Sequence, residues 1–568
     1  MTNVKRWLFK HENFFLAVLF IILACWFSNY LLFQGFGLYS DDWPAMANNA
    51  KFELFKNAND AFDWFKIWPH GRPLGWFFLS VLGSPARIFE DISYLYVVGF
   101  LIVSTLSVLI FLIVSHKYGK KVGLVVALLF MLSPVDTTRI HLTINYIAHT
   151  GLIFSFLAIL FYQKGQKTIA YIISIAALLC YESTFFPFVA AVLLTYSVFS
   201  LKTWKKQVIH ILFCAIVVIL VQLIRYSISG FHQKEVQQGA WDLVTLFISG
   251  ISSYTIHFFE FFFWGLKQGY ENIDFISLIL AISFFAVITF MVRRDKVSPT
   301  ITSMKQSYDL FIVGFVLLIL GLLLSGLASY YPHMAWGGRN TRVYMAATFG
   351  GAVIITALLA ALYQFTQRDR RRYIADIVLI IILFGLVGNN LKIQRDYVES
   401  WDIQKQVLRS SLDMACDAKP GDTIILVPQQ PRWDRGRAMG VYGFGYSTAI
   451  ADIFDWGKLP LFQIPRIMRG NKNWHEHLEF RKDGKLYWKK QQLSGYLPLA
   501  MSSLKPGTII FLRGTKQGLV RENSLEIDGI NILKEDNSSL RKEKCLFHAK
   551  PLTGPLAAWV YPDLIGLR

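Results

Sequence analysis

The first 390 residues alternate between long apolar runs and short polar connections. Most runs extend over about 17–25 residues, the length with which an α-helix crosses a bilayer. Two of them, 122–135 and 168–183, are short and need extension into their polar flanks or a thinner bilayer. The pattern predicts an α-helical polytopic membrane protein with about eleven transmembrane helices. The eleven runs are 13–34, 93–115, 122–135, 144–162, 168–183, 184–201, 207–228, 275–292, 308–329, 345–366 and 374–390.

A further apolar segment, TLFISGISSYTIHFFEFFFWGL at 245–266, is long enough to be a twelfth span. Counting it would place the basic cluster from Arg293 to Lys296 outside the membrane, against the retention of basic residues on the cytoplasmic side. Its many aromatic side chains suit the boundary between lipid and water. We therefore expect this segment to lie in the outer interface or to be re-entrant.

Basic residues gather in the connections on one side of the predicted spans. Because Lys and Arg mark cytoplasmic loops, this side and the N-terminus are predicted to be cytoplasmic. Eleven spans then place the C-terminal part outside the cytoplasm, in a multi-pass protein of the bacterial plasma (inner) membrane. The clusters are Lys5, Arg6 and Lys10; Lys117, Lys120 and Lys121; Lys164 and Lys167; Lys202, Lys205 and Lys206; Arg293, Arg294, Lys296 and Lys305; and Arg368, Arg370, Arg371 and Arg372.

The composition changes after about residue 391, where Gly, Pro and charged residues become frequent. Two short β-branched runs, TIILV at 423–427 and TIIFL at 508–512, each follow a Pro-Gly turn signal. Alternating turns and β-branched runs are typical of strands. We predict a membrane domain over 1–390, with a long outer loop at 35–92 that holds juxtamembrane helices, and a small extracytoplasmic α/β domain over 391–568.

The overall composition agrees with a membrane protein, because 54% of the 568 residues are hydrophobic and only 17% are charged. The net charge of +19 does not indicate nucleic-acid binding, since much of it lies in the short clusters between apolar runs. The cysteines show no metal-binding spacing: Cys25, Cys180 and Cys214 lie in apolar runs and are interpreted as core residues. Whether Cys416 and Cys545 pair does not follow from their spacing.

The motif YSDDWP, just after the first run, places two adjacent carboxylates, Asp41 and Asp42, in the long outer loop. Asp42 precedes Trp43-Pro44 and would suit a helix N-cap. That role does not account for the second carboxylate. Two neighbouring carboxylates can divide their tasks, one acting as a base while the other binds or orients. The same loop also carries Arg72 in PHGRPLGWFF.

Two other outer connections are rich in polar side chains. Since an ionisable residue inside a membrane span is by default a functional candidate, His149 and Glu182 are notable. A satisfied structural hydrogen bond is the alternative for each His, and an exposed turn is the alternative for Glu182. The polar residues of these connections are Asp136, Arg139, His141, Asn145 and His149 in PVDTTRIHLTINYIAH, and Tyr181 and Glu182 in CYESTFFP.

The last short outer connection, YYPHMAWGGRNTRVY at 330–344, holds Arg339 and Arg342 three residues apart, beside His333 and Tyr344. Two guanidinium groups at a membrane boundary suit a phosphate, whose oxygens they bind bidentately. They lie on the wrong side to be topology signals. The alternative is that they extend toward the phosphates of surrounding lipids. An outer face with a carboxylate pair and an arginine pair suggests a base acting near an anionic lipid head group.

These features resemble the GT-C superfamily of integral membrane glycosyltransferases, which use polyprenyl-phosphate-linked sugars. The resemblance covers the whole topology and rests on Asp41 and Asp42 after the first span, on the late loop with Arg339 and Arg342, and on the C-terminal domain. It implies an inverting hexosyl or pentosyl transfer to an acceptor hydroxyl, with Asp41 or Asp42 as general base. Arg339 and Arg342 would hold the donor phosphate. Further candidates for substrate binding are Arg72, His141, His149, Glu182, Tyr181, Tyr344 and His333.

The resemblance also bears on cofactors and partners. We expect no cofactor and do not favour a divalent metal, because the sequence lacks an obvious cluster of further acidic ligands. The expected partners are a polyprenyl-phosphate-linked sugar donor, membrane lipid, and a glycan, lipid or protein acceptor used in modifying cell-envelope glycans. The sequence names neither the sugar nor the acceptor. In the C-terminal domain, Arg432, Trp433 and Arg435 would suit either glycan binding or packing on the membrane domain.

Two alternative functions differ in where they would place polar residues. A lipid-linked glycan polymerase or ligase is expected to carry its basic and His residues in a large late outer loop, whereas 330–344 is short. A non-enzymatic lipid-glycan transporter is expected to have polar residues through the midplane and an internal repeat. The polar residues of this chain gather on one face instead. The sequence therefore favours the glycosyltransferase.

Overall fold

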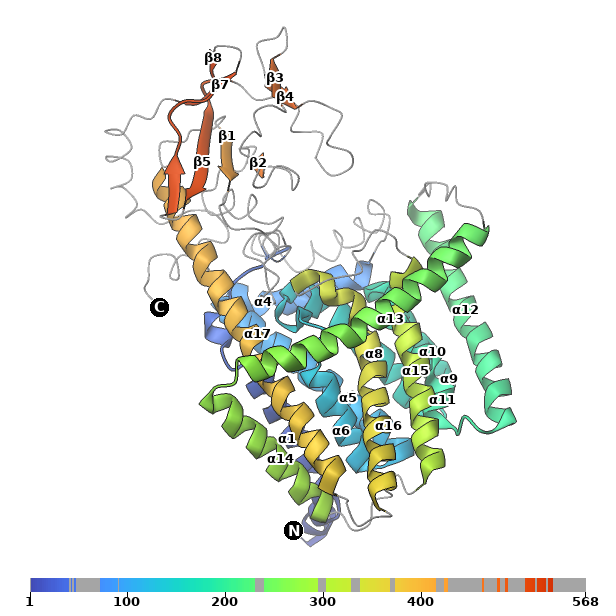
Figure 1. Cartoon of the computed structure of the whole chain (residues 1–568). Helices are drawn as coiled ribbons and strands as arrows, with labels where there is room; N and C mark the ends of the chain where they lie inside the picture. Colours follow the sequence, from blue (N-terminus) through green and yellow to red (C-terminus); the bar gives the residue numbers. More distant parts are fainter. Residues whose placement is uncertain are drawn as a thin grey trace. The chain divides into compact units, whose positions relative to one another are not determined.

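A computed structural model gives the fold (Figure 1) and describes residues 2–39, 42, 45–46, 72–89, 91–229, 240–294, 303–327, 338–367, 373–414, 423–427, 462–463, 478–480, 486–488, 506–515, 518–527 and 530–534. The chain forms two compact units. The helical unit comprises Met1–Gln34, Glu53–Leu82 and Leu95–Asp396, and the second unit comprises Gly35–Phe52, Gly83–Tyr94 and Tyr397–Arg568. The predicted boundary at 390/391 falls inside a helix that continues to Met414, and the predicted domains remain an expectation.

The helical unit is a bundle of apolar helices. Among the described residues, seven segments are long and apolar enough to cross a membrane: Phe14–Gly35, Ser93–Tyr118, Leu142–Gln163, Leu201–Ile224, Met304–Gly326, Ala347–Thr366 and Ile374–Gln406. They confirm seven of the eleven predicted runs and the class of the protein, although the full count of eleven stays a prediction. The long helices are α1 (Thr2–Asn29), α5 (Ser93–Tyr118), α8 (Thr150–Gln163), α12 (Leu201–Ser229), α14 (Phe275–Arg294), α15 (Met304–Leu327), α16 (Ala347–Gln367) and α17 (Tyr373–Met414).

Of the four remaining predicted runs, 275–292 forms α14 and the other three form shorter helices. The runs 122–135 and 168–183 form α6 (Lys120–Leu132) and α9 (Lys167–Cys180), which are as short as the sequence suggests. The run 184–201 is not one helix, because it divides into α10 (Phe186–Val189) and α11 (Ala191–Thr195). Pro187 lies in the first turn of α10, and Ala190 leaves helical geometry between the two pieces. A proline starts a helix readily but cannot continue one, and hydropathy alone does not register this.

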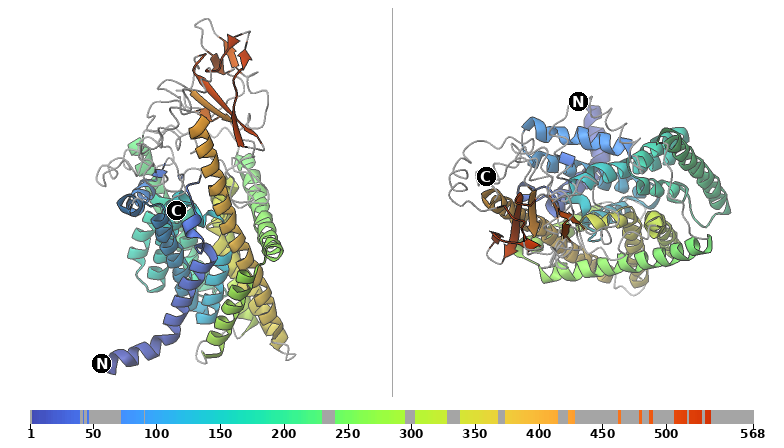
Figure 2. Two further views of the ribbon diagram at one scale, coloured as in Figure 1. Left: turned by 90° about the vertical axis from the view of Figure 1, so that its left-hand side faces the viewer. Right: turned by 90° about the horizontal axis from the view of Figure 1, so that it is seen from above.

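Helix α13 (Ala240–Glu271) contains the ambiguous segment 245–266. It is not among the seven candidate spans. It runs obliquely across α15 and α16, which follow the length of the bundle (Figure 1 and Figure 2). Gly265 allows it to approach Pro134, because a Cβ there would come within 2.3 Å of the proline ring. Whether this segment crosses the membrane or lies in its interface stays a prediction.

Long-range contacts divide the connections of the helical unit between two ends. At one end, which we call the site end, hydrogen bonds join residue 137 to 341 and residue 72 to 182. At the opposite end, Asp309 near the start of α15 bonds to Lys117 near the end of α5 and to Val198. This separation agrees with the predicted alternation of the spans. Which end faces the cytoplasm remains a prediction.

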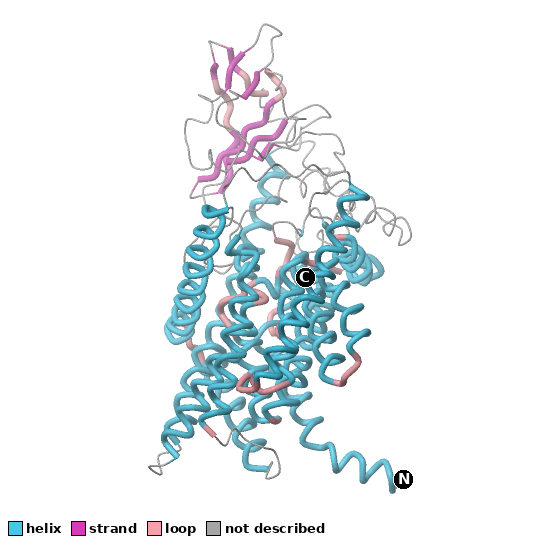
Figure 3. The backbone as a smooth tube through the Cα atoms, turned by 90° about the vertical axis from the view of Figure 1, so that its right-hand side faces the viewer, coloured by secondary structure: helices cyan, strands magenta, loops and turns pink. Residues whose placement is uncertain are grey.

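The described part of the second unit contains every strand of the structure, shown in magenta in Figure 3. The predicted runs form β1 (Thr423–Val427) and β5 (Ile509–Thr515), which pair in parallel with Ile425 opposite Phe511. With β2 (Phe462–Gln463) and β6 (Gly518–Arg521) they form a four-stranded sheet of order β2-β1-β5-β6. Two hairpins, β3 (Leu478–Phe480) with β4 (Leu486–Trp488) and β7 (Glu526–Ile527) with β8 (Ile530–Asn531), complete the described strands. The two sequence-predicted strands are thus confirmed.

Candidate functional site

The site end of the helical unit contains a buried charged pair, Asp136 and His149. Asn145–His149 forms a π-helical turn just before α8, and its last residue directs His149 Nε2 to 3.1 Å from Asp136 Oδ2. Both side chains are only 1% exposed. A π-helical turn is rare and often marks a functional site. His149 Nδ1 has no partner among the described residues, so this buried ring retains one nitrogen for another interaction.

Asp136 also organises its own loop. Its Oδ1 accepts hydrogen bonds from the Thr138 main-chain N–H at 2.9 Å and from the Thr138 hydroxyl at 2.5 Å. Burial by itself raises the pKa of the Asp136 carboxyl, but the hydrogen bond and charge of His149, with help from Arg139 and Thr138, outweigh it. The net result is a pKa lowered to about 2, so the carboxylate is held ionised.

Arg139 fixes the same loop to α6, to Tyr30 just after α1 and to the π-helical turn. Its guanidinium donates to the main-chain carbonyls of Phe130 and Met131, in the last turn of α6. Its own carbonyl accepts from Tyr30 Oη at 2.8 Å and Asn145 Nδ2 at 2.7 Å. A cation suits the partial negative charge at a helix C-terminus. Arg139 is therefore a structural residue in this unit, and the loop 133–141 is a firmly held platform.

A second loop from far along the chain rests on this platform. The 3-10 turn Gly338–Tyr344 contains both candidate phosphate ligands, and Thr341 within it contacts Thr137. The Thr137 main-chain N–H donates to Thr341 Oγ1 at 3.0 Å, and the two hydroxyl oxygens are also 3.0 Å apart. Arg342 is half-buried next to this contact; the side chain of Arg339 and all of His333 lie outside the described residues.

Tyr344 closes the turn under helix α13. Its side chain is fully buried and lies against the rings of Tyr254, Phe258 and Phe261 of α13, at centroid distances of 5.6–6.2 Å. Burial raises the pKa of the Tyr344 phenol well above its usual value, and Tyr254 adds to the effect. The residue therefore stays neutral and acts as an aromatic anchor. Helix α13 therefore contacts the site end at two places. Its aromatic rings pack on Tyr344, and its Gly265 lies against Pro134.

Three predicted candidates form a separate cluster at the site end. Arg72 donates through Nε to Glu182 Oε2 at 3.0 Å, with its Nη2 2.9 Å from the same oxygen. The guanidinium also stacks over the Tyr181 ring at 4.0 Å. Arg72 precedes α4 (Pro73–Phe89), and a Cβ on Gly75 in its first turn would meet Ile147 of the π-helical turn at 2.6 Å. The cluster thus lies beside the turn that carries His149.

The acidic motif belongs to the second unit. Asp42 is fully buried, and its Oδ2 accepts from the Tyr39 main-chain N–H at 3.4 Å. Tyr39 is equally buried, donates its hydroxyl to the carbonyl of Tyr397 at 2.8 Å and packs edge-on against the Tyr397 ring. Burial raises the pKa of the Tyr39 phenol well above its usual value. Asp42 is therefore bonded to the main chain of a buried tyrosine, which itself packs against Tyr397. Asp41 lies outside the described residues.

Several loops singled out in the sequence contact each other in the structure, through residues that the sequence did not indicate. The structure brings Arg72, Tyr181 and Glu182 together, and it places Arg342 and Tyr344 against the loop that carries His141, with His141 itself fully buried. The joining residues, Thr137 and Thr341, carried no sequence signal. Cys416, Cys545, Arg432, Trp433 and Arg435 lie outside the described residues. The described residues contain no group of three or more His, Cys, Asp or Glu side chains that could hold a metal; whether a metal acts stays a prediction.

Comparison with known proteins gives a distant structural likeness. No protein-family model matches the sequence, and no curated protein matches it. Among solved structures, the chain is similar to ArnT from Cupriavidus metallidurans in the apo state, with 13% sequence identity and a TM-score of 0.33. The match covers 81% of this chain and 88% of that chain. These values assign neither a family nor an activity.

Proposed function

We propose that this chain is an inverting glycosyltransferase of the membrane. In this proposal it moves a sugar from a polyprenyl-phosphate donor to an acceptor hydroxyl at the outer face, where it modifies cell-envelope glycans. The resemblance of the sequence to the GT-C superfamily supports the reaction. The seven candidate membrane helices support the setting, because both donor and enzyme then share a bilayer.

The observation that carries the proposal is the way in which the arginine-bearing turn is anchored to the helical unit. Gly338–Tyr344 is bonded to the loop 133–141 through Thr341 and is buried under α13 through Tyr344. The turn therefore presents Arg342 from a fixed backbone at the site end. A guanidinium fork held in this way suits a phosphate, since a preorganised cation costs no reorganisation when charge develops on the leaving group. We assign the donor phosphate to Arg342 and Arg339.

The proposed chemistry is a single displacement. Asp41 or Asp42 accepts the proton of the acceptor hydroxyl, whose oxygen forms a bond to the anomeric carbon from the face opposite the donor phosphate. The bond from that carbon to the phosphate oxygen breaks, and the lipid phosphate leaves with the electron pair. The sugar thereby changes its anomeric configuration. The burial of Asp42 and its bond to the Tyr39 main chain support a positioned carboxylate, because a base must be held in a fixed geometry to reach its proton.

The alternative functions receive less support. A polymerase or ligase remains close in chemistry, and it differs in using a lipid-linked glycan as donor. A transporter would use Arg342 for binding without any bond breaking. The buried pair of Asp136 and His149 and the pair of Arg72 and Glu182 gather at the site end with the turn, which fits a one-sided reaction site better than a transport path.

The experiment that tests this function measures donor and acceptor separately. The purified protein in lipid nanodiscs is given a radiolabelled polyprenyl-phosphate sugar, and both binding and transfer are recorded for Arg342→Ala and Arg339→Ala. Loss of a charged hydrogen bond of about 1.5–3 kcal/mol should weaken donor binding about 10- to 100-fold and leave the acceptor KM unchanged. Arg395→Ala, at an exposed arginine paired with Asp274, is the matched control. Equal weakening of donor and acceptor would contradict the phosphate assignment.

A further inference from the structure

Thr137 and Thr341 form a polar link between two loops that lie 204 positions apart in the sequence. Thr341 Oγ1 donates to the carbonyl of Gly338 at 2.9 Å and accepts from the Thr137 main-chain N–H at 3.0 Å. Its remaining lone pair faces the Thr137 hydroxyl, also at 3.0 Å. A hydroxyl has one donor and two acceptor sites, and all three are used here. Both side chains are buried, so no water competes for them.

The Thr137 side of the link is rigid. Asp136, the preceding residue, bonds to Thr138 on one oxygen and to His149 on the other. Arg139 then fastens the end of the loop to α6, Tyr30 and Asn145. Thr137 therefore has little freedom to follow the other loop. Any adjustment of the contact must come from the turn that carries Thr341.

The two halves of the turn Gly338–Tyr344 are held differently, and the first half is held at the Gly338 carbonyl, which lies 2.9 Å from Thr341 Oγ1 and 3.4 Å from Thr137 Oγ1. The last residues of the turn are held by Ser325 Oγ, which donates to the Val343 carbonyl at 3.2 Å, and by Tyr344 under α13. The first residues begin at Gly338, whose φ of 63° only a glycine adopts easily. Thr341 binds back to this glycine and across to Thr137. It thus sets the path of the backbone that carries Arg339 and Arg342.

We infer that Thr137 and Thr341 are positioning residues that set the orientation of the phosphate-binding turn. Asp136 and His149 act behind them by holding Thr137 in place. This inference rests on the proposed function, because it concerns the donor phosphate of that site. Neither threonine touches the donor. Their hydroxyl contact keeps Arg339 and Arg342 presented from one backbone conformation, which favours binding because the ordering is complete before the donor arrives.

The first arm of the test measures the link itself. Hydrogen–deuterium exchange of the peptide covering 338–346 is recorded in nanodiscs for Thr341→Val, Thr341→Ser and Thr356→Val. Valine keeps the volume and loses the hydroxyl, so exchange of this peptide should rise about 3- to 10-fold, whereas serine should restore it. Thr356 is the control, since its buried hydroxyl bonds only within α16, to the carbonyl of Ala352. Unchanged exchange in Thr341→Val would overturn the inference.

The second arm measures the consequence for the donor. Thr341→Val should raise the KM for the polyprenyl-phosphate sugar about 3- to 10-fold, with kcat changed less than about twofold, and Thr341→Ser should behave like the wild type. A rise in exchange with an unchanged donor KM would overturn the positioning role while the transferase stands. A wild type that transfers no sugar would instead overturn the proposed function, and the exchange arm would still decide whether the two loops are coupled.

Discussion

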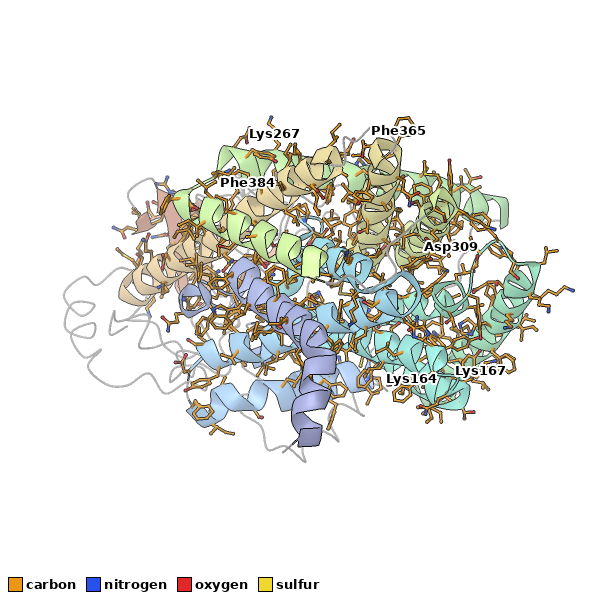
Figure 4. The ribbon with its side chains drawn as sticks, turned by 90° about the horizontal axis from the view of Figure 1, so that it is seen from below. Lys164, Lys167, Lys267, Asp309, Phe365 and Phe384 are labelled. Atoms are coloured by element: carbon orange, nitrogen blue, oxygen red, sulfur yellow. The ribbon has the colours of Figure 1, made fainter. Side chains whose placement is uncertain are left out.

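Two buried charged pairs lie at opposite ends of the helical unit, and they differ in how completely their polar atoms are used. At the opposite end, Asp309 accepts from Lys117, Tyr118, Ser197 and the Val198 N–H, and Lys117 also donates to two carbonyls of the α11 region. Figure 4 shows Asp309 inside the bundle, with Lys164 and Lys267 at its rim. At the site end, His149 Nδ1 and Arg139 Nε have no partner among the described residues.

This difference distinguishes a structural ion pair from a candidate functional site. The pair of Lys117 and Asp309 joins the ends of α5, α11 and α15, and its hydrogen bonds are made within the unit. The pair of Asp136 and His149 joins a loop to a π-helical turn and leaves buried polar atoms available. Buried polar groups that lack partners are costly, and native proteins keep them chiefly where a function or a bound molecule uses them. We therefore read the first pair as structural and the second as part of the site.

The largest expected effect is the loss of stability when the ion pair of Lys117 and Asp309 is removed. Asp309→Ala leaves the Lys117 ammonium buried without its carboxylate, which should cost about 3–5 kcal/mol. The measurement is unfolding in mixed micelles as the denaturing detergent fraction rises. Glu271→Ala is the control, because Glu271 is half-exposed in its pair with Lys267 and its removal should change little. Equal stability of the two variants would show that Asp309 does not stabilise the helical unit.

An intermediate loss of stability is expected when the pH is lowered, because of Asp136 at the site end. Asp136 has a pKa lowered to about 2 in the folded protein, from an ordinary value of 3.8. A lowered pKa gives stability that is present above the ordinary value and is lost as the pH falls toward 2, here roughly 2 kcal/mol. Stability measured between pH 5 and about pH 2 should therefore fall less steeply in Asp136→Asn than in the wild type. Parallel pH profiles would contradict the ionised pairing with His149.

The smallest effect is expected at the pair of Arg72 and Glu182, which is partly exposed. A double-mutant cycle with Arg72→Ala and Glu182→Ala should give a coupling of about 1 kcal/mol or less, since solvent screens the pair. The stacking of Arg72 on Tyr181 should persist in Glu182→Gln. A coupling as large as the roughly 3–5 kcal/mol expected for Lys117 and Asp309 would mean that Arg72 and Glu182 are structural as well. The two ends of the helical unit would then not differ in the role of their ion pairs.

The sequence predicted those features that depend on local pattern. Apolar length located the seven candidate spans, and β-branched runs after Pro-Gly turns located β1 and β5. The basic cluster after α14 argued against a crossing role for 245–266; the segment lies in α13, which runs obliquely, and its place in the membrane stays a prediction. Each of these signals lies within one stretch of chain, where hydrophobic length, turn chemistry or charge placement acts directly.

Features that depend on long-range contact could not be predicted. Lys117 was interpreted as a topology signal among other cytoplasmic lysines, but it is buried against Asp309, nearly two hundred positions away. Arg72 and Glu182 were separate candidates, and the structure pairs them. Thr137 and Thr341 have no periodicity or charge that marks them. The division of the run 184–201 is the exception, since Pro187 was visible in the sequence and a proline suits the first turn of a new helix, here α10, which ends before Ala190.

The central claim, that a carboxylate of YSDDWP is the general base, is tested most directly by separate Asp41→Asn and Asp42→Asn variants. Sugar transfer and donor binding are measured for each in the purified protein, with Asp402→Asn, at an exposed aspartate paired with Lys405, as control. Because general base catalysis contributes about 10²–10⁴-fold, one variant should lose at least a hundredfold in kcat while still binding the donor. Full transfer rates in both variants would contradict the account.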